Sequence, residues 1–67
     1  MKRVAICIDA WKLPIFKKKL FEHAFDYDEH PGVTEDTLTL TVWTFDVELL
    51  AEVVQAANDE AAKSKLN

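Results

Sequence analysis

Residues 37–46 read TLTLTVWTFD, and this strict alternation of polar and apolar side chains decides the fold. Successive side chains of a β-strand point to opposite faces of a sheet, so the alternation is typical of a strand with one buried face. We expect the strand Thr37–Asp46 to build the core with Leu38, Leu40 and Val42. Its other face carries Thr39, Thr41, Trp43 and Phe45. Two aromatic side chains on a polar face indicate a contact surface, unless the chain covers them itself.

Two further runs alternate in the same way. The run Lys2–Asp9 predicts a strand whose faces are Val4, Ile6 and Ile8 on one side and Arg3, Ala5, Cys7 and Asp9 on the other. The shorter run Phe25–His30 predicts another strand, with Phe25 and Tyr27 on one face. The Pro31-Gly32 pair that follows is a strong turn signal, so we expect Pro31–Asp36 to form a hairpin loop into the strand Thr37–Asp46.

Helical spacing governs the other two segments. Proline is tolerated only in the first turn of a helix, so Pro14 predicts a helix that begins near residues 11–13. Its apolar stripe is expected to be Leu13, Phe16, Leu20 and Ala24, mostly opposite Lys17, Lys18, Lys19 and Glu22. Asp46 is placed to cap a second helix that runs to about Lys63. The apolar stripe of this helix is Leu49, Leu50, Val53, Val54, Ala57 and Ala61.

The resulting order, β-α-β-β-α, predicts one α+β domain over residues 1–67, with a three-stranded mixed sheet and two helices on one face. It resembles a ferredoxin-like split βαβ unit that lacks its last strand. A right-handed crossover is expected to place the strand Thr37–Asp46 between the other two and parallel to the first. The missing strand would leave the edge Arg3–Ile8 bare. We therefore expect two copies to join edge to edge as a homodimer.

Composition limits the function classes. The 67 residues carry a net charge of −4, and eleven of the twelve carboxylates lie between Glu22 and Glu60, a segment without Lys or Arg. Cys7 is the only cysteine, which excludes an internal disulfide and favours the reducing cytoplasm. The apolar run Val4–Ile8 is too short for a signal-peptide core or a membrane span.

Catalytic and metal chemistry find little support. His23, Asp26, Asp28, Glu29 and His30 are of metal-ligating types, but they lack a recognised spacing, and a solvated acidic hairpin is the favoured interpretation. Cys7 is interpreted as a small apolar filler. Gly32 is the only glycine, which argues against a glycine-rich phosphate loop. We expect no enzyme activity and no cofactor.

Two alternatives to protein binding are retained. Lys17, Lys18 and Lys19, together with Lys12, form a basic helix face, and Trp43 with Phe45 could stack on bases, although an acidic chain is a poor nucleic-acid binder. A small-molecule-binding regulatory domain is the other alternative, by analogy of fold alone. The acidic segment suits either a basic protein partner or plain solubility.

Four segments, Ala5–Asp9, Trp11–Phe16, Asp36–Val42 and Ala56–Asn58, resemble small uncharacterised proteins encoded in phage and prophage genomes. The resemblance implies a non-enzymatic accessory protein that binds a host or phage protein, for instance as an inhibitor of host defence. Together these observations predict a small, homodimeric protein-interaction module. The candidate interface residues are Arg3, Ala5, Cys7, Trp43, Phe45, Lys17 and Lys18.

Overall fold

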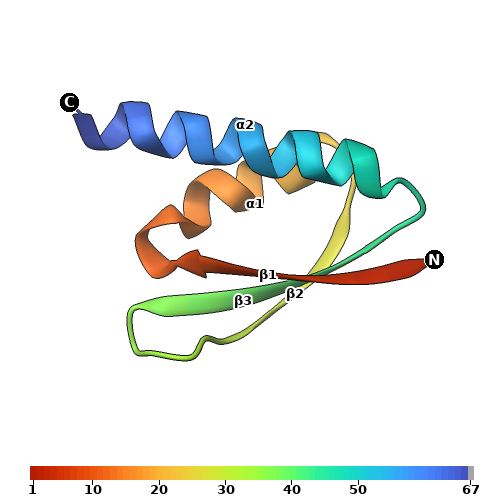
Figure 1. The fold of residues 1–67 in the computed structure, drawn as a ribbon, viewed down its shortest axis with the longest axis horizontal. Coiled ribbons are helices and arrows are strands. Elements are labelled where there is room, and N and C mark those ends of the chain that lie inside the picture. Colours follow the sequence, from red (N-terminus) through yellow and green to blue (C-terminus); the bar gives the residue numbers. More distant parts are fainter. Residues whose placement is uncertain (67) are drawn as a thin grey trace.

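The computed structural model describes residues 1–66 and has the predicted α+β class, with a three-stranded sheet and two helices (Figure 1). A 3₁₀ turn that the predicted order lacks stands between the first strand and the first helix. The elements are β1 (Lys2–Asp9), the turn η1 (Ala10–Lys12), α1 (Leu13–Glu22), β2 (Asp26–Pro31), β3 (Thr37–Thr44) and α2 (Val47–Leu66).

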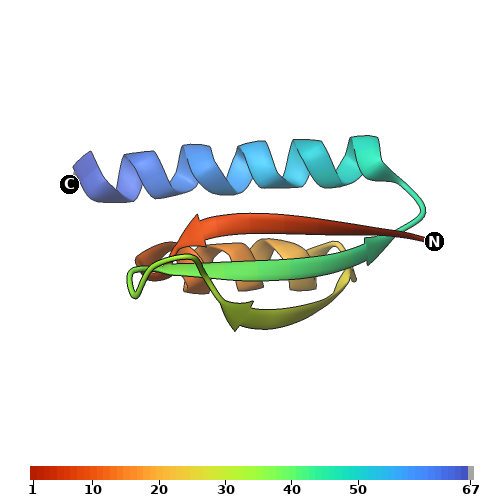
Figure 2. The ribbon, with the colours of Figure 1, turned by 60° about the horizontal axis from the view of Figure 1, so that its bottom comes forward.

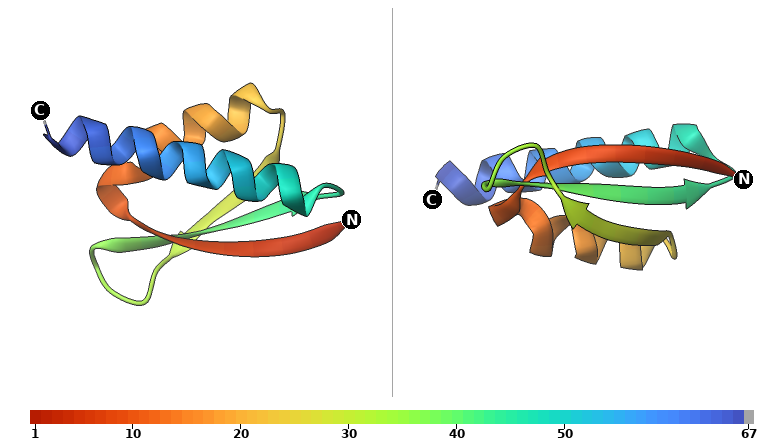
Figure 3. Two further views of the ribbon diagram at one scale, coloured as in Figure 1. Left: turned by 45° about the horizontal axis from the view of Figure 1, so that its top comes forward. Right: turned by 90° about the horizontal axis from the view of Figure 1, so that it is seen from below.

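The sheet has the order β1-β3-β2, so β3 is its central strand, as the sequence predicted. Both neighbours of β3 are antiparallel to it. The prediction of a mixed sheet with β3 parallel to β1 is therefore wrong. The chain crosses over through α1 and re-enters as β2 in the direction of β1, and the hairpin then reverses it, so β3 opposes both neighbours (Figure 3).

Both helices lie on the same face of the sheet. Seen from below, the sheet stands in front of the two helices, with α2 behind β1 and α1 behind β2 (Figure 3, right). The same arrangement, turned less far, is seen in Figure 2. Between helices and sheet lies one apolar core, whose fully buried large side chains are Phe16, Leu20, Leu40, Val42 and Leu50. Leu40 and Val42 confirm which face of β3 was predicted to be core.

The first turn of α1 follows the proline rule. Pro14 occupies the first turn of the helix, where its missing N–H costs no hydrogen bond, and η1 precedes it. The Ala10 N–H donates to the carbonyl of Asp36 at 2.7 Å, which ties this entry to the β2–β3 loop.

The predicted apolar stripe of α1 is wrong at Ala24, because the helix ends at Glu22. Ala24 adopts a left-handed conformation with φ 57°. Its N–H donates to the carbonyl of Phe21, and the N–H of Phe25 donates to the carbonyl of Leu20, both at 3.0 Å. This is the Schellman arrangement, which satisfies the last carbonyls of a helix. Phe25 therefore belongs to this helix-ending turn and not to the predicted strand Phe25–His30, and β2 starts at Asp26.

Replacing Ala24 by glycine is expected to raise the free energy of unfolding by about 0.5–1 kcal/mol, because an L-residue is strained in the left-handed region and glycine is not. Urea unfolding measures the change. The matched control is His23→Gly, at a position with φ −100°, where glycine only adds chain entropy to the unfolded state and should destabilise. A loss of stability in Ala24→Gly would contradict the expectation.

The turn from β3 into α2 is closed by two polar side chains. Thr44 is buried, and its Oγ1 accepts from the Asp46 N–H at 2.9 Å. The Asp46 carboxylate accepts from the Leu49 N–H at 3.0 Å, which confirms the predicted cap. β3 therefore ends at Thr44, and Phe45 lies in the bend rather than on a sheet face, contrary to prediction. The helix runs on to Leu66, beyond the predicted Lys63.

None of the helices within residues 1–66 combines the length and the apolar character that crossing a membrane requires.

Candidate functional site

The face of the sheet turned away from the helices is covered by no element of the described chain, and we call it the open face (Figures 2 and 3). The strand register arranges its side chains in rows across β1, β3 and β2. The rows are Arg3, Trp43 and Asp26; Ala5, Thr41 and Asp28; and Cys7, Thr39 and His30. The fold thus brings together four of the predicted interface residues, Arg3, Ala5, Cys7 and Trp43.

One corner of the open face is aromatic. Trp43 is partly buried in its row, whereas Phe45 in the following bend is 83% exposed. Both line a hollow of about 250 Å³ beside the end of α1. The wall of this hollow also includes Met1, His23, Ala24, Phe25, Asp26, Thr44, Asp46 and Leu49. Trp43 and Phe45 are therefore neighbours, although they do not share a strand face.

The two edges of the sheet differ in chemistry. β2 carries Asp26, Asp28 and Glu29 within six residues and ends in Pro31, and charges and proline are the devices that block pairing at an edge. β1 has an uncharged run, Val4–Ile8, between its charged ends. Among residues 1–66 no strand lies beside the outer side of β1. One edge is thus protected and the other is not.

Cys7 is exposed, so the interpretation of this residue as an apolar filler is wrong. The reason is that the open face has no cover. His30 lies in the same row but two strands away, a separation of about 10 Å that is too long for proton transfer.

The basic face of α1 is largely neutralised by neighbouring carboxylates. Lys17 Nζ lies 3.3 Å from Glu29, and Lys19 Nζ lies 3.8 Å from Glu60 of α2. Lys18 is exposed on the same helix. The strand register places Trp43 on the open face, whereas α1 covers the other face of the sheet (Figure 3). The structure therefore does not bring together the lysines and the aromatic side chain that nucleic-acid binding would combine.

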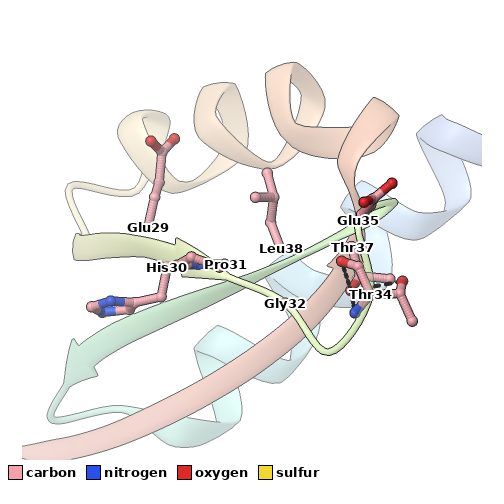
Figure 4. A pocket seen from close by; sticks show the side chains of 8 residues that line it. All are labelled: Glu29, His30, Pro31, Gly32, Thr34, Glu35, Thr37 and Leu38. Carbon is pink, nitrogen blue, oxygen red and sulfur yellow. Dashed lines mark hydrogen bonds between the residues drawn. The ribbon is translucent and has the colours of Figure 1, made fainter.

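A second hollow, of about 350 Å³, lies beside the β2–β3 loop (Figure 4). Pro31 and Leu38 form its apolar wall, and the Glu29 and His30 side chains point to opposite sides of β2. Hydrogen bonds between Thr34 and Thr37 stay within the loop. Within the described residues the polar lining of the hollow consists of Glu29, His30, Thr34, Glu35 and Thr37, and the two residues of β2 lie apart from the other three.

The predicted metal-ligating residues are also spread out. Asp28 and His30 belong to the open face, whereas Glu29 turns to the helix face and pairs with Lys17. Within residues 1–66 no three His, Cys, Asp or Glu side chains come close enough to hold a metal ion.

Sequence reasoning missed one surface, an uncharged flank of α2 formed by Val47, Ala51, Val54 and Asn58, which we call the α2 stripe. Glu60 lies on the side of α2 that faces α1, where it pairs with Lys19. Helical spacing places the α2 stripe on the other side of α2, which itself lies over β1. Val47 is 41% exposed, Ala51 is exposed, and Val54 and Asn58 are half-buried. The signal was present as uncharged residues at i, i+4, i+7 and i+11, but it merged with the core stripe.

Comparison with protein-family models, curated proteins and solved structures finds no match to this chain.

Proposed function

We propose that this protein is a small, non-enzymatic interaction module that works as a homodimer joined through the outer edge of β1. The contrast between the two sheet edges carries the proposal. An apolar edge strand without charges, proline or cover is a template for further strand pairing, and natural proteins block such edges unless they use them. Here β2 is blocked, while Val4–Ile8 is open.

Size supports the same conclusion. A chain of 67 residues buries about 60% of its unfolded surface, so its stability gains from a partner. Edge pairing of two copies turns two three-stranded sheets into one six-stranded sheet and satisfies the outer backbone groups of both β1 strands. We keep the interpretation of the fold as a ferredoxin-like unit without its fourth strand, which would lie beside β1 in the complete fold.

The open face is the proposed contact surface for a protein partner. It is rimmed by Trp43 and the exposed Phe45 at one corner, and aromatic side chains are enriched at protein interfaces. Asp26 and Asp28 on β2 make the neighbouring side acidic, which favours a partner with a basic surface. The resemblance to phage-encoded proteins implies a host or phage protein as this partner.

Replacing Ala5 by lysine tests the dimer. Ala5 is exposed on the open face of β1, so the lysine leaves the core intact, but it places two charges close together at the edge that pairs. We expect a dimer of the wild-type protein at micromolar concentration in sedimentation equilibrium, and for Ala5→Lys a dissociation constant at least tenfold larger, which shifts the protein toward monomer. Circular dichroism should be unchanged.

The matched control is Asp28→Lys, because Asp28 lies in the same row as Ala5 but at the protected edge. This variant should remain dimeric. A wild-type protein that is still monomeric at about 100 µM would overturn the proposal. A dimer that Asp28→Lys disrupts and Ala5→Lys leaves intact would overturn it as well.

A further inference from the structure

We infer that the partner of β1 is a second copy paired in one particular register, with Ile6 on the two-fold axis. The inference rests on the proposed dimer and adds the register and the contacts that select it. It follows from strand parity, from the charges at the two ends of β1 and from the α2 stripe.

The alternation of side chains along a strand excludes half of the possible registers between the two β1 strands. A two-fold axis perpendicular to the sheet makes the two β1 strands antiparallel and keeps all four helices on one face. Directly opposite residues of antiparallel strands point to the same face. One residue of β1 must therefore stand directly opposite the same residue of the second copy, and the axis lies between these two. This is what is meant below by an axis on a residue. Ala5, Ile6 and Cys7 are the central residues on which it can lie.

The three possible axis positions differ in the number of paired residues and in the charges that come to stand opposite each other. An axis on Cys7 pairs only residues 5–9, whereas an axis on Ala5 or on Ile6 pairs seven residues. With Ala5 on the axis, Lys2 stands opposite the buried Ile8, which sets an ammonium group against the apolar core.

With Ile6 on the axis, the contacts on both faces match. Arg3 stands opposite Asp9 of the second copy, twice by symmetry, and both side chains belong to the open face. On the helix face Val4 stands opposite Ile8 of the second copy, which joins the two cores. Opposite charges directly across a strand pair stabilise the pairing.

The position of α2 is compatible with this dimer. α2 lies over β1 on the helix face of the sheet (Figure 3, right). In the proposed dimer the two-fold axis beside β1 therefore places the α2 helices of the two copies next to each other, with their α2 stripes facing. Val47, Ala51, Val54 and Asn58 carry no charge, and a small residue such as Ala51 allows the helix axes to approach to about 8–10 Å. The occupant that covers both the β1 edge and the α2 stripe is thus a second copy of this chain.

The formation of disulfides between the two copies tests the register, because only cysteines that stand opposite each other can be linked. With Ile6 on the axis, Ala5 stands opposite Cys7 of the second copy, so Ala5→Cys should give a disulfide-linked dimer under mild oxidation, in more than half of the chains. Wild-type Cys7 pairs lie on a diagonal of about 7–8 Å and should not cross-link. The control variants are Ala5→Cys combined with Cys7→Ser, which should not cross-link either, and Asp28→Cys with Cys7→Ser on the other edge.

The outcomes separate the register from the dimer. Cross-linking of the wild type would put Cys7 on the axis, and cross-linking of the Ala5→Cys, Cys7→Ser variant would put Ala5 there. Each overturns the register and leaves the proposed function intact. A dimer in reducing sedimentation that none of these variants cross-links overturns pairing through β1. A monomer overturns both the register and the proposed function.

A charge exchange gives an independent measure. Arg3→Asp and Asp9→Arg should each weaken the dimer about tenfold, since each sets like charges opposite one another twice. Arg3→Asp combined with Asp9→Arg should restore the wild-type dissociation constant, because the opposite charges face each other again. Failure of the combined variant to recover, with both single variants folded, would overturn the Ile6 register.

Discussion

Replacing Phe16 by alanine is expected to lower the free energy of unfolding by about 3–5 kcal/mol, the range for a fully buried phenylalanine. Phe16 is 1% exposed and lies in the core between α1, the sheet and α2. A domain of this length has a total stability of about 3–10 kcal/mol. The variant should therefore lose a large part of its stability, and urea denaturation followed by tryptophan fluorescence measures the loss.

Phe21→Ala is the matched control, because Phe21 lies on the same helix and is 83% exposed. It removes the same atoms from the surface and should change stability by no more than about 0.5 kcal/mol. A Phe16→Ala variant as stable as Phe21→Ala would show that the helix does not pack on the sheet through this residue. A loss of about 3–5 kcal/mol in both variants would instead mean that the exposed face of α1 is buried against a partner.

Replacing Gly32 by alanine is expected to cost about 2–3 kcal/mol, through a clash that the β2–β3 loop cannot avoid. A Cβ at Gly32 would lie 2.5 Å from the carbonyl carbon of Thr37 and 2.6 Å from its carbonyl oxygen. These are backbone atoms, so the chain itself must move. The movement also opens the hydrogen bond from the Gly32 N–H to the Thr37 carbonyl, now 3.1 Å long.

The neighbouring Val33→Ala serves as the control, since Val33 is 92% exposed in the same loop and its truncation should be neutral within about 0.5 kcal/mol. Hydrogen exchange adds a local readout, because amides at the loop end of β3 should exchange faster in Gly32→Ala than those of α2. An unchanged midpoint of urea unfolding would mean that the loop takes a different conformation.

The dimer, if formed as proposed, also changes the open face. Six strands would present one continuous surface, with Ala5 and Cys7 of both copies at its centre and Trp43 toward each end of the shared edge. The small central residues leave a flat strip there, while the two aromatic corners stand apart. A partner protein would therefore meet a two-fold symmetric surface rather than a single patch.

Local signals in the sequence were sufficient for much of this fold. The alternation in residues 37–46 identified β3 and its core face, because strand side chains alternate in any sheet. Pro14 located the start of α1 and Asp46 that of α2, since both act through backbone groups within one turn. These features depend on neighbours in the chain, which the sequence lists.

Tertiary structure alone decided the direction of β3 against β1, the end of β3 before Phe45 and the exposure of Cys7. Each depends on segments far apart in the chain, namely the crossover through α1, the turn that Thr44 and Asp46 close, and a sheet face that no described element covers. The left-handed Ala24 is a further case, because alanine carries no local preference for that conformation and accepts it only where the chain must turn into β2. The sequence by itself determined which segments form strands and helices. Only their packing determined which edge and which face are left open, because that depends on where the other elements come to lie.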